Sequence, residues 1–331
     1  MKIAILDDYQ DAVRTLPSFK LLDGHDVKVF TNSSRGLGQL AIRLAPFDAL
    51  VLIRERTGFN RALLSKLPNL KLLSQTGKVS GHIDVAAATE LGIAIAEGVG
   101  SPTAPAELTW ALIMAAQRKI VPYANNLKDG LWQTVSTDGE LNTLGSVLKG
   151  RTLAIWGYGK IGQLVAGYGR AFGMKILVWG SATSRDAAVA AGDQAAPSRE
   201  EFFAWADVLS LHVRLTETTH GLVTADDLAR MKPGALFVNT SRAELVAEGA
   251  LEAALQLGRP GAAALDVFRN EPLPPDTPLL RMPNVLATPH LGYVERDSYE
   301  LYFSYALQNV VDFAAGTCSR LLNPEYATKR T

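Results

Sequence analysis

The sequence predicts two α/β domains, each built around a doubly wound parallel sheet. Its 331 residues are too many for one ordinary core and fit about two domains of roughly 150 residues each. Short apolar runs alternate with polar, helix-like segments, which is the pattern of βαβ units. This pattern restarts after a helical segment near the middle of the chain, so we expect a second sheet.

The first hundred residues carry the first series of strands. The apolar runs that we assign to it are Lys2 to Leu6, Val27 to Phe30, Ala49 to Ile53, Lys71 to Leu73 and Ile93 to Ala96. A segment rich in alanine and leucine, from Pro105 to Arg118, then follows a Ser-Pro-Thr start that favours a helix. We expect this helix to lead into the second domain.

A second series of six strands matches a dinucleotide-binding sheet. Its predicted members are Arg151 to Trp156, Lys175 to Trp179, Val208 to His212, Ala235 to Asn239, Ala262 to Val267 and Val285 to Ala287. The segment from Glu295 to Ala315 looks helical and has no following strand, so we expect it to return to the first domain. The predicted domains are therefore residues 1–103 with 292–331, and an inserted domain of residues 104–291.

Composition favours a small-molecule ligand over a macromolecular one. Lysine plus arginine equals aspartate plus glutamate at 33 each, so no global charge attracts nucleic acid or a membrane. The single cysteine, Cys318, forms no internal disulfide and has no histidines at metal-ligand spacing, so we predict no metal. This usage fits the cytoplasm, and no run of about 18 apolar residues predicts a membrane span.

A glycine loop follows the first strand of the second series. The glycines are Gly157, Gly159 and Gly162. The first allows a tight turn, the second lets the backbone approach pyrophosphate closely, and the third lets the helix pack on the strand. The N-terminus of the following helix faces negative charge. We therefore predict a nicotinamide dinucleotide here, contacted also by Tyr158, Lys160 and Ile161.

The choice between NAD and NADP stays open. About 20 residues after the glycines, an acid normally binds the adenosine ribose, but no acid follows Trp179 until Asp186. Without that carboxylate a 2′-phosphate is not repelled, and Ser181 and Arg185 are candidates to bind it, which weakly favours NADP. Alternatively, the ribose faces water and Arg185 is a solvated helix charge.

Hydride transfer to a carbon that bears oxygen needs a proton donor and a cation. Histidine suits the first task because it titrates near neutrality, and arginine suits the second by its bidentate fork. His212 and His290 both end apolar strands of the second sheet, at the edge where ligands bind. Position alone does not choose between them, and either is equally a structural residue at a strand end.

Four motifs in order resemble the D-isomer-specific 2-hydroxyacid dehydrogenases, and the similarity covers nearly the whole chain. They are Gly-Tyr-Gly-Lys-Ile-Gly at 157–162, Val-Asn-Thr-Ser-Arg at 238–242, Asp-Val-Phe-Arg-Asn-Glu-Pro at 266–272 and Thr-Pro-His-Leu-Gly at 288–292. The resemblance implies a Rossmann NAD(P)-binding domain inserted in a flavodoxin-like substrate domain. It also implies hydride transfer between the nicotinamide and C2 of a small 2-hydroxy or 2-keto acid, such as glyoxylate, hydroxypyruvate or a 3-phosphoglycerate-like compound.

The resemblance assigns a catalytic triad to this chain. Arg242 would bind the substrate carboxylate and carbonyl, His290 would be the acid and base, and Glu271 would hydrogen-bond the imidazole. By the same similarity Thr240 borders the nicotinamide and Asp266 binds its carboxamide or ribose. His212 resembles the histidine that precedes a cofactor-contacting loop, although Arg214 stands where proline is usual.

A loop of the first domain resembles the glycine-rich substrate loop of the family. It spans Gln75 to Asp84, and the amide positions that hold a carboxylate fall on Lys78 and Val79, next to Gly77. The lysine adds charge for a phosphorylated or dicarboxylic substrate, or else is simply solvated. Arg54, at a strand end, is similar to a position near the substrate, with a surface salt bridge as the alternative.

The alternatives to this function are dinucleotide sensing by a corepressor-like protein and oxidation of formate or phosphite. Transcriptional corepressors that sense dinucleotides resemble this family and keep the triad, but this chain lacks an extended disordered tail. Formate dehydrogenases pair the histidine with glutamine, so Glu271 argues against formate or phosphite oxidation. The helix near Pro105 resembles a dimer-forming segment, which implies a homodimer; its apolar face of Leu108, Leu112 and Ala115 is otherwise core.

Overall fold

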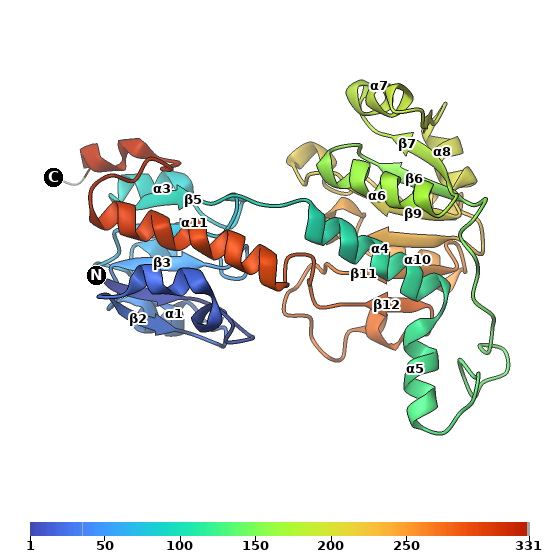
Figure 1. Cartoon of the computed structure of the whole chain (residues 1–331), viewed down its shortest axis with the longest axis horizontal. Coiled ribbons are helices and arrows are strands. Elements are labelled where there is room, and N and C mark those ends of the chain that lie inside the picture. The colour runs from blue at the N-terminus through green and yellow to red at the C-terminus, as the bar shows by residue number, and fades with distance from the viewer. Residues whose placement is uncertain (35, 330–331) are drawn as a thin grey trace. The chain divides into compact units, whose positions relative to one another are not determined.

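The computed structural model describes residues 1–34 and 36–329, and the chain divides into two compact units (Figure 1). The first unit joins Met1–Ser101 to Val294–Thr331, and the second is Pro102–Tyr293. The sequence prediction placed the corresponding boundaries after residues 103 and 291. The second unit is thus an insertion in the first.

The first unit contains a five-stranded parallel sheet in the order β2-β1-β3-β4-β5. The strands are β1 (Lys2–Ile5), β2 (Asp26–Val29), β3 (Ala49–Leu52), β4 (Leu72–Gln75) and β5 (Ala94–Glu97). This is the flavodoxin-like order, in which the first strand lies inside the sheet. The predicted fold class is confirmed for this unit.

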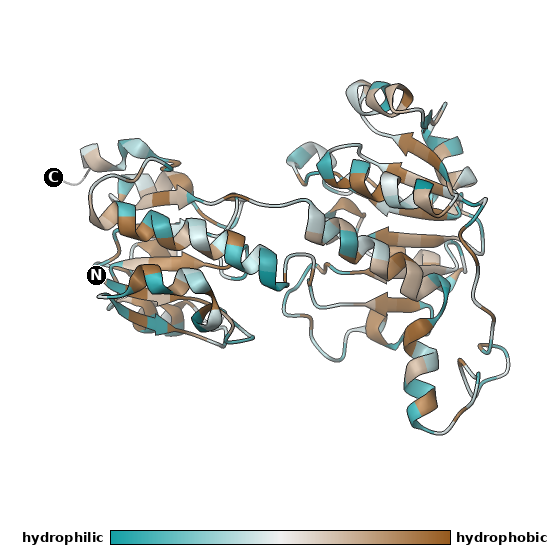
Figure 2. Cartoon of the chain, viewed as in Figure 1, coloured by the Kyte–Doolittle hydropathy of each residue, from teal (hydrophilic) through white to brown (hydrophobic). Residues whose placement is uncertain are grey.

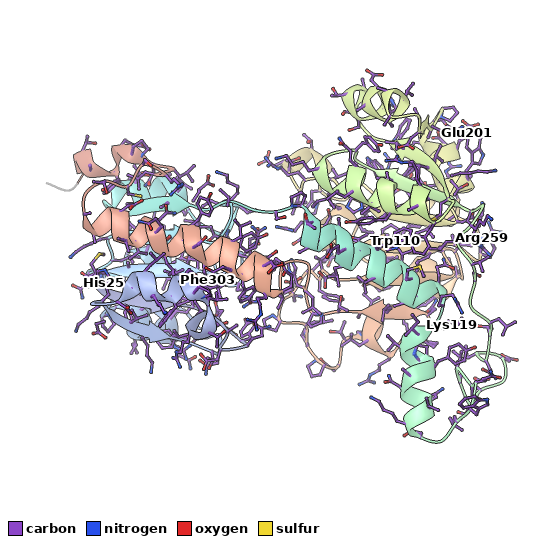
Figure 3. The ribbon with its side chains drawn as sticks, in the orientation of Figure 1. His25, Trp110, Lys119, Glu201, Arg259 and Phe303 are labelled. Atoms are coloured by element: carbon purple, nitrogen blue, oxygen red, sulfur yellow. The ribbon has the colours of Figure 1, made fainter. Side chains whose placement is uncertain are left out.

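Helices cover both faces of this sheet, so its inner strands are largely buried, and β3 is apolar along its whole length. On one face Leu44, Leu63 and Ala87 of α1 to α3 pack with sheet residues such as Leu50. On the other face α11 lies against β3, β4 and β5 and buries Phe303 (Figure 3). The helices are α1 (Leu37–Leu44), α2 (Arg61–Leu64), α3 (Val85–Glu90) and α11 (Arg296–Ala314), with short 3-10 helices η1 (Val13–Thr15), η2 (Pro17–Leu22) and η6 (Pro324–Lys329).

The second unit contains a seven-stranded parallel sheet in the order β12-β11-β10-β9-β6-β7-β8. Its strands are β6 (Thr152–Trp156), β7 (Lys175–Trp179), β8 (Gln194–Ala195), β9 (Val208–Leu211), β10 (Leu236–Asn239), β11 (Ala262–Leu265) and β12 (Val285–Ala287). Later strands are added on both sides of β6, with β7 and β8 on one side and β9 to β12 on the other, as in Rossmann sheets. Six of these strands are predicted by the sequence, whereas the two-residue edge strand β8 is too short to give a pattern.

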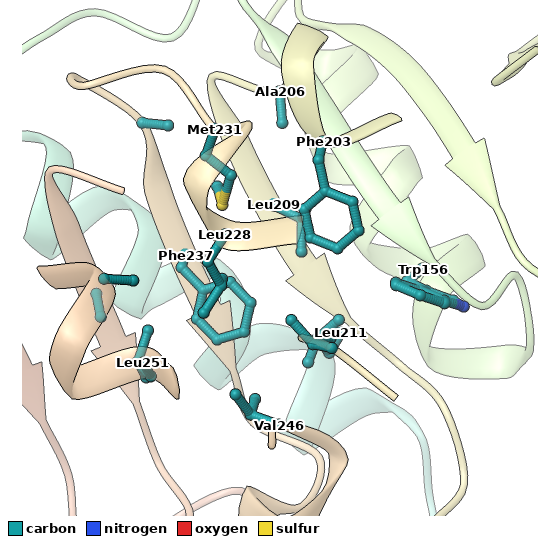
Figure 4. Close-up of a cluster of buried hydrophobic side chains, with 14 of the residues drawn as sticks. Trp156, Phe203, Ala206, Leu209, Leu211, Leu228, Met231, Phe237, Val246 and Leu251 are labelled. Atoms are coloured by element: carbon teal, nitrogen blue, oxygen red, sulfur yellow. The ribbon is translucent and has the colours of Figure 1, made fainter. Parts of the chain in front are cut away.

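Alternate residues of β6 point to opposite faces, and both faces are buried. Leu153 and Ile155 pack against α4 and α6, while Trp156 contacts Phe202 and Phe203 of α8 on the other face (Figure 4). The hydropathy colouring shows the resulting apolar strands (Figure 2). The helices are α4 (Thr103–Gln117), α5 (Ile120–Lys128), α6 (Lys160–Ala171), α7 (Ala182–Ala190), α8 (Arg199–Trp205), α9 (Ala225–Ala229) and α10 (Ala250–Gln256), with η3 (Glu217–Thr219), η4 (Ala243–Leu245) and η5 (Pro278–Arg281).

Helix α4 is part of the core of the second unit. Leu112 is buried in that core, and Trp110, labelled in Figure 3, packs on Tyr168 and Phe172 beside α6. The apolar face that the sequence predicts on this helix is therefore used at least in part within the unit. By contrast, α5 and the segment after it carry several exposed apolar side chains: Ile120, Val121, Leu127, Trp132, Leu141, Leu144 and Val147.

Candidate active site

The predicted cofactor and catalytic residues of the second unit follow the carboxyl ends of its parallel strands. His290 follows β12, Glu271 lies in the loop after β11, and Arg242 follows β10. His212 and Gly157 follow the next two strands, β9 and β6. Because carboxyl ends of parallel strands meet at one edge, this edge presents a continuous series of polar and glycine positions.

The glycine loop has the geometry that a dinucleotide pyrophosphate needs. Gly157 has a φ of +94°, and a Cβ there would lie 2.5 Å from the carbonyl oxygen of His212. A Cβ at Gly162 would collide with the carbonyl of Gly157. Around Gly159, however, no protein atom would contact a Cβ within 4 Å. Packing therefore requires the outer glycines, while the middle one leaves open space at the N-terminus of α6, where backbone N–H groups favour an anion.

The other residues of this loop divide between core and surface. Lys160 is exposed at the first turn of α6, and Ile161 packs on the core. The Tyr158 side chain is buried, and its hydroxyl donates to Asp193, 2.5 Å away. Burial and this bond raise the pKa of Tyr158. Only the backbone of Tyr158 is therefore available to a cofactor, because the side chain packs in the core and its hydroxyl is bonded to Asp193.

The segment after β7 combines a helix N-terminus with a stacked arginine. Ser181 caps α7, and its hydroxyl accepts the Ser184 amide at 3.3 Å. The Arg185 guanidinium lies 4.8 Å from the centre of the Trp179 ring, within the range of a cation–π contact. Hydroxyl, amide and guanidinium groups thus converge where the usual acid is missing.

His212 is neutral across most of the pH range in which the protein would work. Burial of its imidazole lowers the pKa of His212 to about 4, although the residue as a whole is only half-buried. Its Nε2 lies 2.9 Å from the Ser210 hydroxyl. Sequence position alone left His212 and His290 as equal candidates. Among residues 1–34 and 36–329 the hydrogen-bond partner of the His212 ring is the Ser210 hydroxyl rather than a carboxylate, which favours a structural role for His212.

The loop after β10 carries Arg242 and is held by hydrogen bonds between the Asn239 side chain and the loop backbone. The Asn239 side chain accepts the Ser241 amide at 3.0 Å and donates to the Arg242 carbonyl at 2.8 Å. The half-buried Arg242 side chain bonds the Ser241 carbonyl at 2.7 Å. Thr240 hydrogen-bonds Thr109 of α4, with 2.7 Å between hydroxyl oxygens. Asn239, which the sequence prediction did not single out, thus holds the backbone of the loop that carries Arg242.

The loop after β11 brings Glu271 and His290 into direct contact. Oε2 of Glu271 lies 2.6 Å from Nδ1 of His290, and Oε1 accepts the Phe268 amide at 2.9 Å. A carboxylate only accepts, so Nδ1 carries the hydrogen and Nε2 is the ring atom that exchanges a proton. The Tyr293 ring packs edge-on against the imidazole, with 5.5 Å between ring centres. The pair is therefore fixed in both position and tautomer.

Asp266 holds the turn that carries His290. Its carboxylate is fully buried and accepts from the Thr288 hydroxyl at 2.7 Å and from the amides of Leu291 and Gly292 at 2.7 and 2.9 Å. Burial raises the pKa of Asp266, and these bonds partly offset the rise. Three partners within the unit favour a positioning role over the cofactor contact that the resemblance implies.

The first unit brings its four predicted residues together at the ends of β3 and β4. The Arg54 guanidinium occupies the space where a Cβ of Gly77 would be, and its Nε lies 3.7 Å from Glu55. Lys78 and Val79 share one partner that the sequence prediction missed, Glu97 at the end of β5. A polar residue that ends a buried strand next to β4 is the signal that would have identified it.

Two kinds of feature are absent from the described residues. Within residues 1–34 and 36–329, no three His, Cys, Asp or Glu side chains are grouped so that they could bind a metal ion. None of the helices in this described part combines the length and apolar character needed to span a bilayer.

A Rossmann sheet with a glycine loop and a paired histidine at its carboxyl edge defines a nicotinamide-dependent oxidoreductase. A family model described as the NAD binding domain of D-isomer specific 2-hydroxyacid dehydrogenases matches residues 110–292. A glyoxylate reductase from Aeropyrum pernix is 40% identical over 256 residues, which cover 77% of this chain and 76% of the relative. This chain belongs to the D-isomer-specific 2-hydroxyacid dehydrogenase family.

Further relatives agree with this membership. A D-3-phosphoglycerate dehydrogenase from Archaeoglobus fulgidus is 32% identical over 295 residues, 89% of this chain but only 54% of that relative. The chain thus spans about half the length of that longer relative. The solved structure of a phosphoglycerate oxidoreductase from Vibrio cholerae is 58% identical, covers 96% of this chain and 99% of its own, and superposes with a TM-score of 0.92. These relatives do not favour the sensing or formate-oxidising alternatives.

Proposed function

We propose that this enzyme interconverts small D-2-hydroxy acids and 2-keto acids, with Arg242, Glu271 and His290 as its catalytic residues. A bound nicotinamide dinucleotide supplies or accepts the hydride at C2 of the substrate. Arg242 binds the substrate carboxylate and carbonyl through its planar fork. His290 gives its Nε2 proton to the carbonyl oxygen during reduction and takes one back during oxidation.

The observation that carries this proposal is the 2.6 Å bond between His290 Nδ1 and Glu271. It leaves Nε2 as the exchanging atom, at the same sheet edge as the glycine loop. Asp266 supports the pair by fixing the backbone on the far side of His290. A histidine held in this way is set up for acid–base work, because its orientation and tautomer are fixed before the substrate binds.

The residues of the glycine loop fit the dinucleotide. Open space at Gly159 and the N-terminus of α6 suit a pyrophosphate, and the partners we propose are Gly157, Tyr158, Gly159, Lys160, Ile161 and Gly162, the first two through the backbone. Thr240, His212 and Asp266 are proposed to flank the nicotinamide end, with Asp266 acting through the turn that it holds.

We propose NADP rather than NAD as the preferred dinucleotide. The proposal is supported by the missing acid after Trp179 and by the Ser181 hydroxyl and Arg185 guanidinium at that strand end. Arginine and hydroxyl donors suit a 2′-phosphate, whereas an acid would repel it.

For the substrate, Arg54, Gly77, Lys78 and Val79 are the proposed contacts from the first unit. Glyoxylate, hydroxypyruvate and 3-phosphoglycerate-like acids are the candidates, since relatives carry the names glyoxylate reductase and D-3-phosphoglycerate dehydrogenase. We also propose a homodimer, because apolar side chains such as Trp132 and Leu144 are exposed in and after α5. The absence of a possible internal disulfide supports a reducing compartment, the cytoplasm.

The test is a panel of 2-keto acids assayed with NADH and with NADPH. We expect turnover of at least one small 2-keto acid by the parent protein, and loss of most activity in Arg242→Ala. Arg230→Ala, an arginine that ends α9 away from the site edge, is the matched control and should retain parental rates. Parental rates in Arg242→Ala, or no turnover of any acid by the folded parent, would contradict the proposal.

A further inference from the structure

Glu97 lies against the substrate loop of the first unit. It is the last residue of β5, and its side chain is 15% exposed. Its Oε1 accepts the Val79 backbone amide at 2.7 Å, and its Oε2 lies 2.8 Å from the Lys78 ammonium. Of the two backbone amides that the resemblance assigns to a substrate carboxylate, that of Val79 therefore already donates to a carboxylate of the chain, and the side chain of Lys78 is paired with the same carboxylate.

The backbone around Glu97 is fixed on both sides. The Glu97 amide donates to the Arg320 carbonyl at 3.1 Å, and its own carbonyl accepts from Asn309 at 3.0 Å. The next residue, Gly98, donates to the Gly77 carbonyl at 2.8 Å. A Cβ at Gly98 would lie 2.8 Å from the Gly77 nitrogen, so only glycine allows this approach. The contact between Glu97 and the loop is thus built into the fold rather than left to a mobile side chain.

Two cations near the loop each have a carboxylate partner. Lys78 is paired with Glu97, and the other nearby cation, Arg54, has Glu55 at 3.7 Å. The Glu97 carboxylate beside the Lys78 ammonium reduces the positive field that a lone ammonium would produce at the loop. A second anionic group on the substrate near this loop would therefore be repelled by the Glu97 carboxylate as well as attracted by the Lys78 ammonium.

We propose that Glu97 determines substrate specificity by charge. It neutralises Lys78 and holds the Val79 amide, so that the enzyme favours 2-keto acids with one carboxylate over those that carry a phosphate or a second carboxylate. This inference rests on the proposed function, because it concerns the substrate that the same site accepts. It identifies glyoxylate-like monoanions as the substrate class and assigns the unusual lysine a pairing role within the chain.

The test compares kcat/KM for oxaloacetate and 3-phosphohydroxypyruvate with that for glyoxylate and pyruvate. In Glu97→Gln the side chain keeps its size and its bond to the Val79 amide but loses its charge. We expect the preference ratio to move about tenfold toward the doubly charged acids, mainly through KM. Glu90→Gln, which removes an exposed carboxylate paired with Arg61 in the same unit, is the matched control and should leave the ratio unchanged.

Lys78→Met supplies an independent test that does not depend on the folding of the first variant. It leaves Glu97 uncompensated, so the ratio should move the opposite way, further toward the monoanions. The compared ratio is kcat/KM for the doubly charged acids divided by kcat/KM for the monoanions. The inference would be overturned if this ratio were unchanged in Glu97→Gln, if it rose in Lys78→Met, or if the parent enzyme already preferred doubly charged acids. Each of these results concerns the preference among 2-keto acids that are turned over, whereas the proposed function fails through the absence of any turnover or through parental rates in Arg242→Ala.

Discussion

Two glutamates in this molecule contact a basic side chain by the same local arrangement, with different consequences. Glu271 and Glu97 each give one carboxylate oxygen to a backbone amide and the other to a basic side chain. The basic partner of Glu271 is His290, whose second ring nitrogen still exchanges protons. The partner of Glu97 is Lys78, whose single charge is neutralised by the contact. In the proposed mechanism only the Glu271 pair transfers a proton, because only its basic member has a second nitrogen.

The largest effect should come from removing the reactive member of the first pair. We expect His290→Ala to lower kcat by roughly a thousandfold, within the range for loss of a general acid. KM should change little, because Arg242 still binds the carboxylate. Steady-state kinetics with glyoxylate measures this, and His220→Gln, outside the strand-end series, should match the parent. A similar loss in both variants would remove His290 from the mechanism.

A histidine without a carboxylate partner sharpens the comparison. The folded His212 has a pKa of about 4, and the unfolded residue titrates near 6.5. As pH falls from 6.5 to 4, the unfolded chain takes up a proton that the folded one does not, so stability is lost across this window, by up to about 3 kcal/mol. Urea unfolding at pH 7 and pH 5 should show a smaller loss in His212→Gln. An identical pH dependence in both proteins would contradict this account of His212.

The acidic member of the first pair should matter less than the histidine. In Glu271→Gln the side-chain amide replaces one acceptor oxygen, so the imidazole loses its fixed tautomer but stays in place. We expect kcat to fall about 10- to 100-fold with KM nearly constant. Glu248→Gln, an acid of the same unit outside the strand-end series, serves as the comparison. A rise in KM alone would show that Glu271 binds substrate rather than positions His290.

The smallest effect concerns the cofactor. Arg185→Ala should lower kcat/KM for NADPH about tenfold and leave NADH nearly unchanged, because only the 2′-phosphate is recognised by the guanidinium. Arg230→Ala, which removes an exposed guanidinium at the end of α9, should not alter the ratio between the two cofactors. If Arg185→Ala weakens both cofactors equally, stacking on Trp179 rather than phosphate recognition is the role of Arg185.

Much of the fold follows from the sequence because both sheets are covered on both faces. Strands such as Ala49–Leu52 and Ala262–Leu265 are uninterrupted apolar runs, and these are easily recognised. The edge strand Gln194–Ala195 has two residues, one of them exposed, and gives no such pattern. The order of the strands follows from the same run of βαβ units, which explains why the doubly wound class could be predicted.

The site is less predictable because its contacts join distant residues. The motifs locate Glu271 and His290. The sequence around Asp266 does not show that its carboxylate accepts the backbone amides of the turn after His290. The same holds for the Tyr158 side chain, which turns into the core. The contact of Glu97 with the substrate loop depends on the register between β4 and β5, and that register becomes visible only in the folded sheet.

A double-mutant cycle on Glu271 and His290 tests the central claim most directly. The measured quantity is kcat for glyoxylate reduction in the parent, Glu271→Gln, His290→Ala and the double variant. If Glu271 acts only through the imidazole, the double variant should be no slower than His290→Ala alone. Independent, multiplicative losses would contradict the account, because Glu271 would then contribute to the reaction without His290.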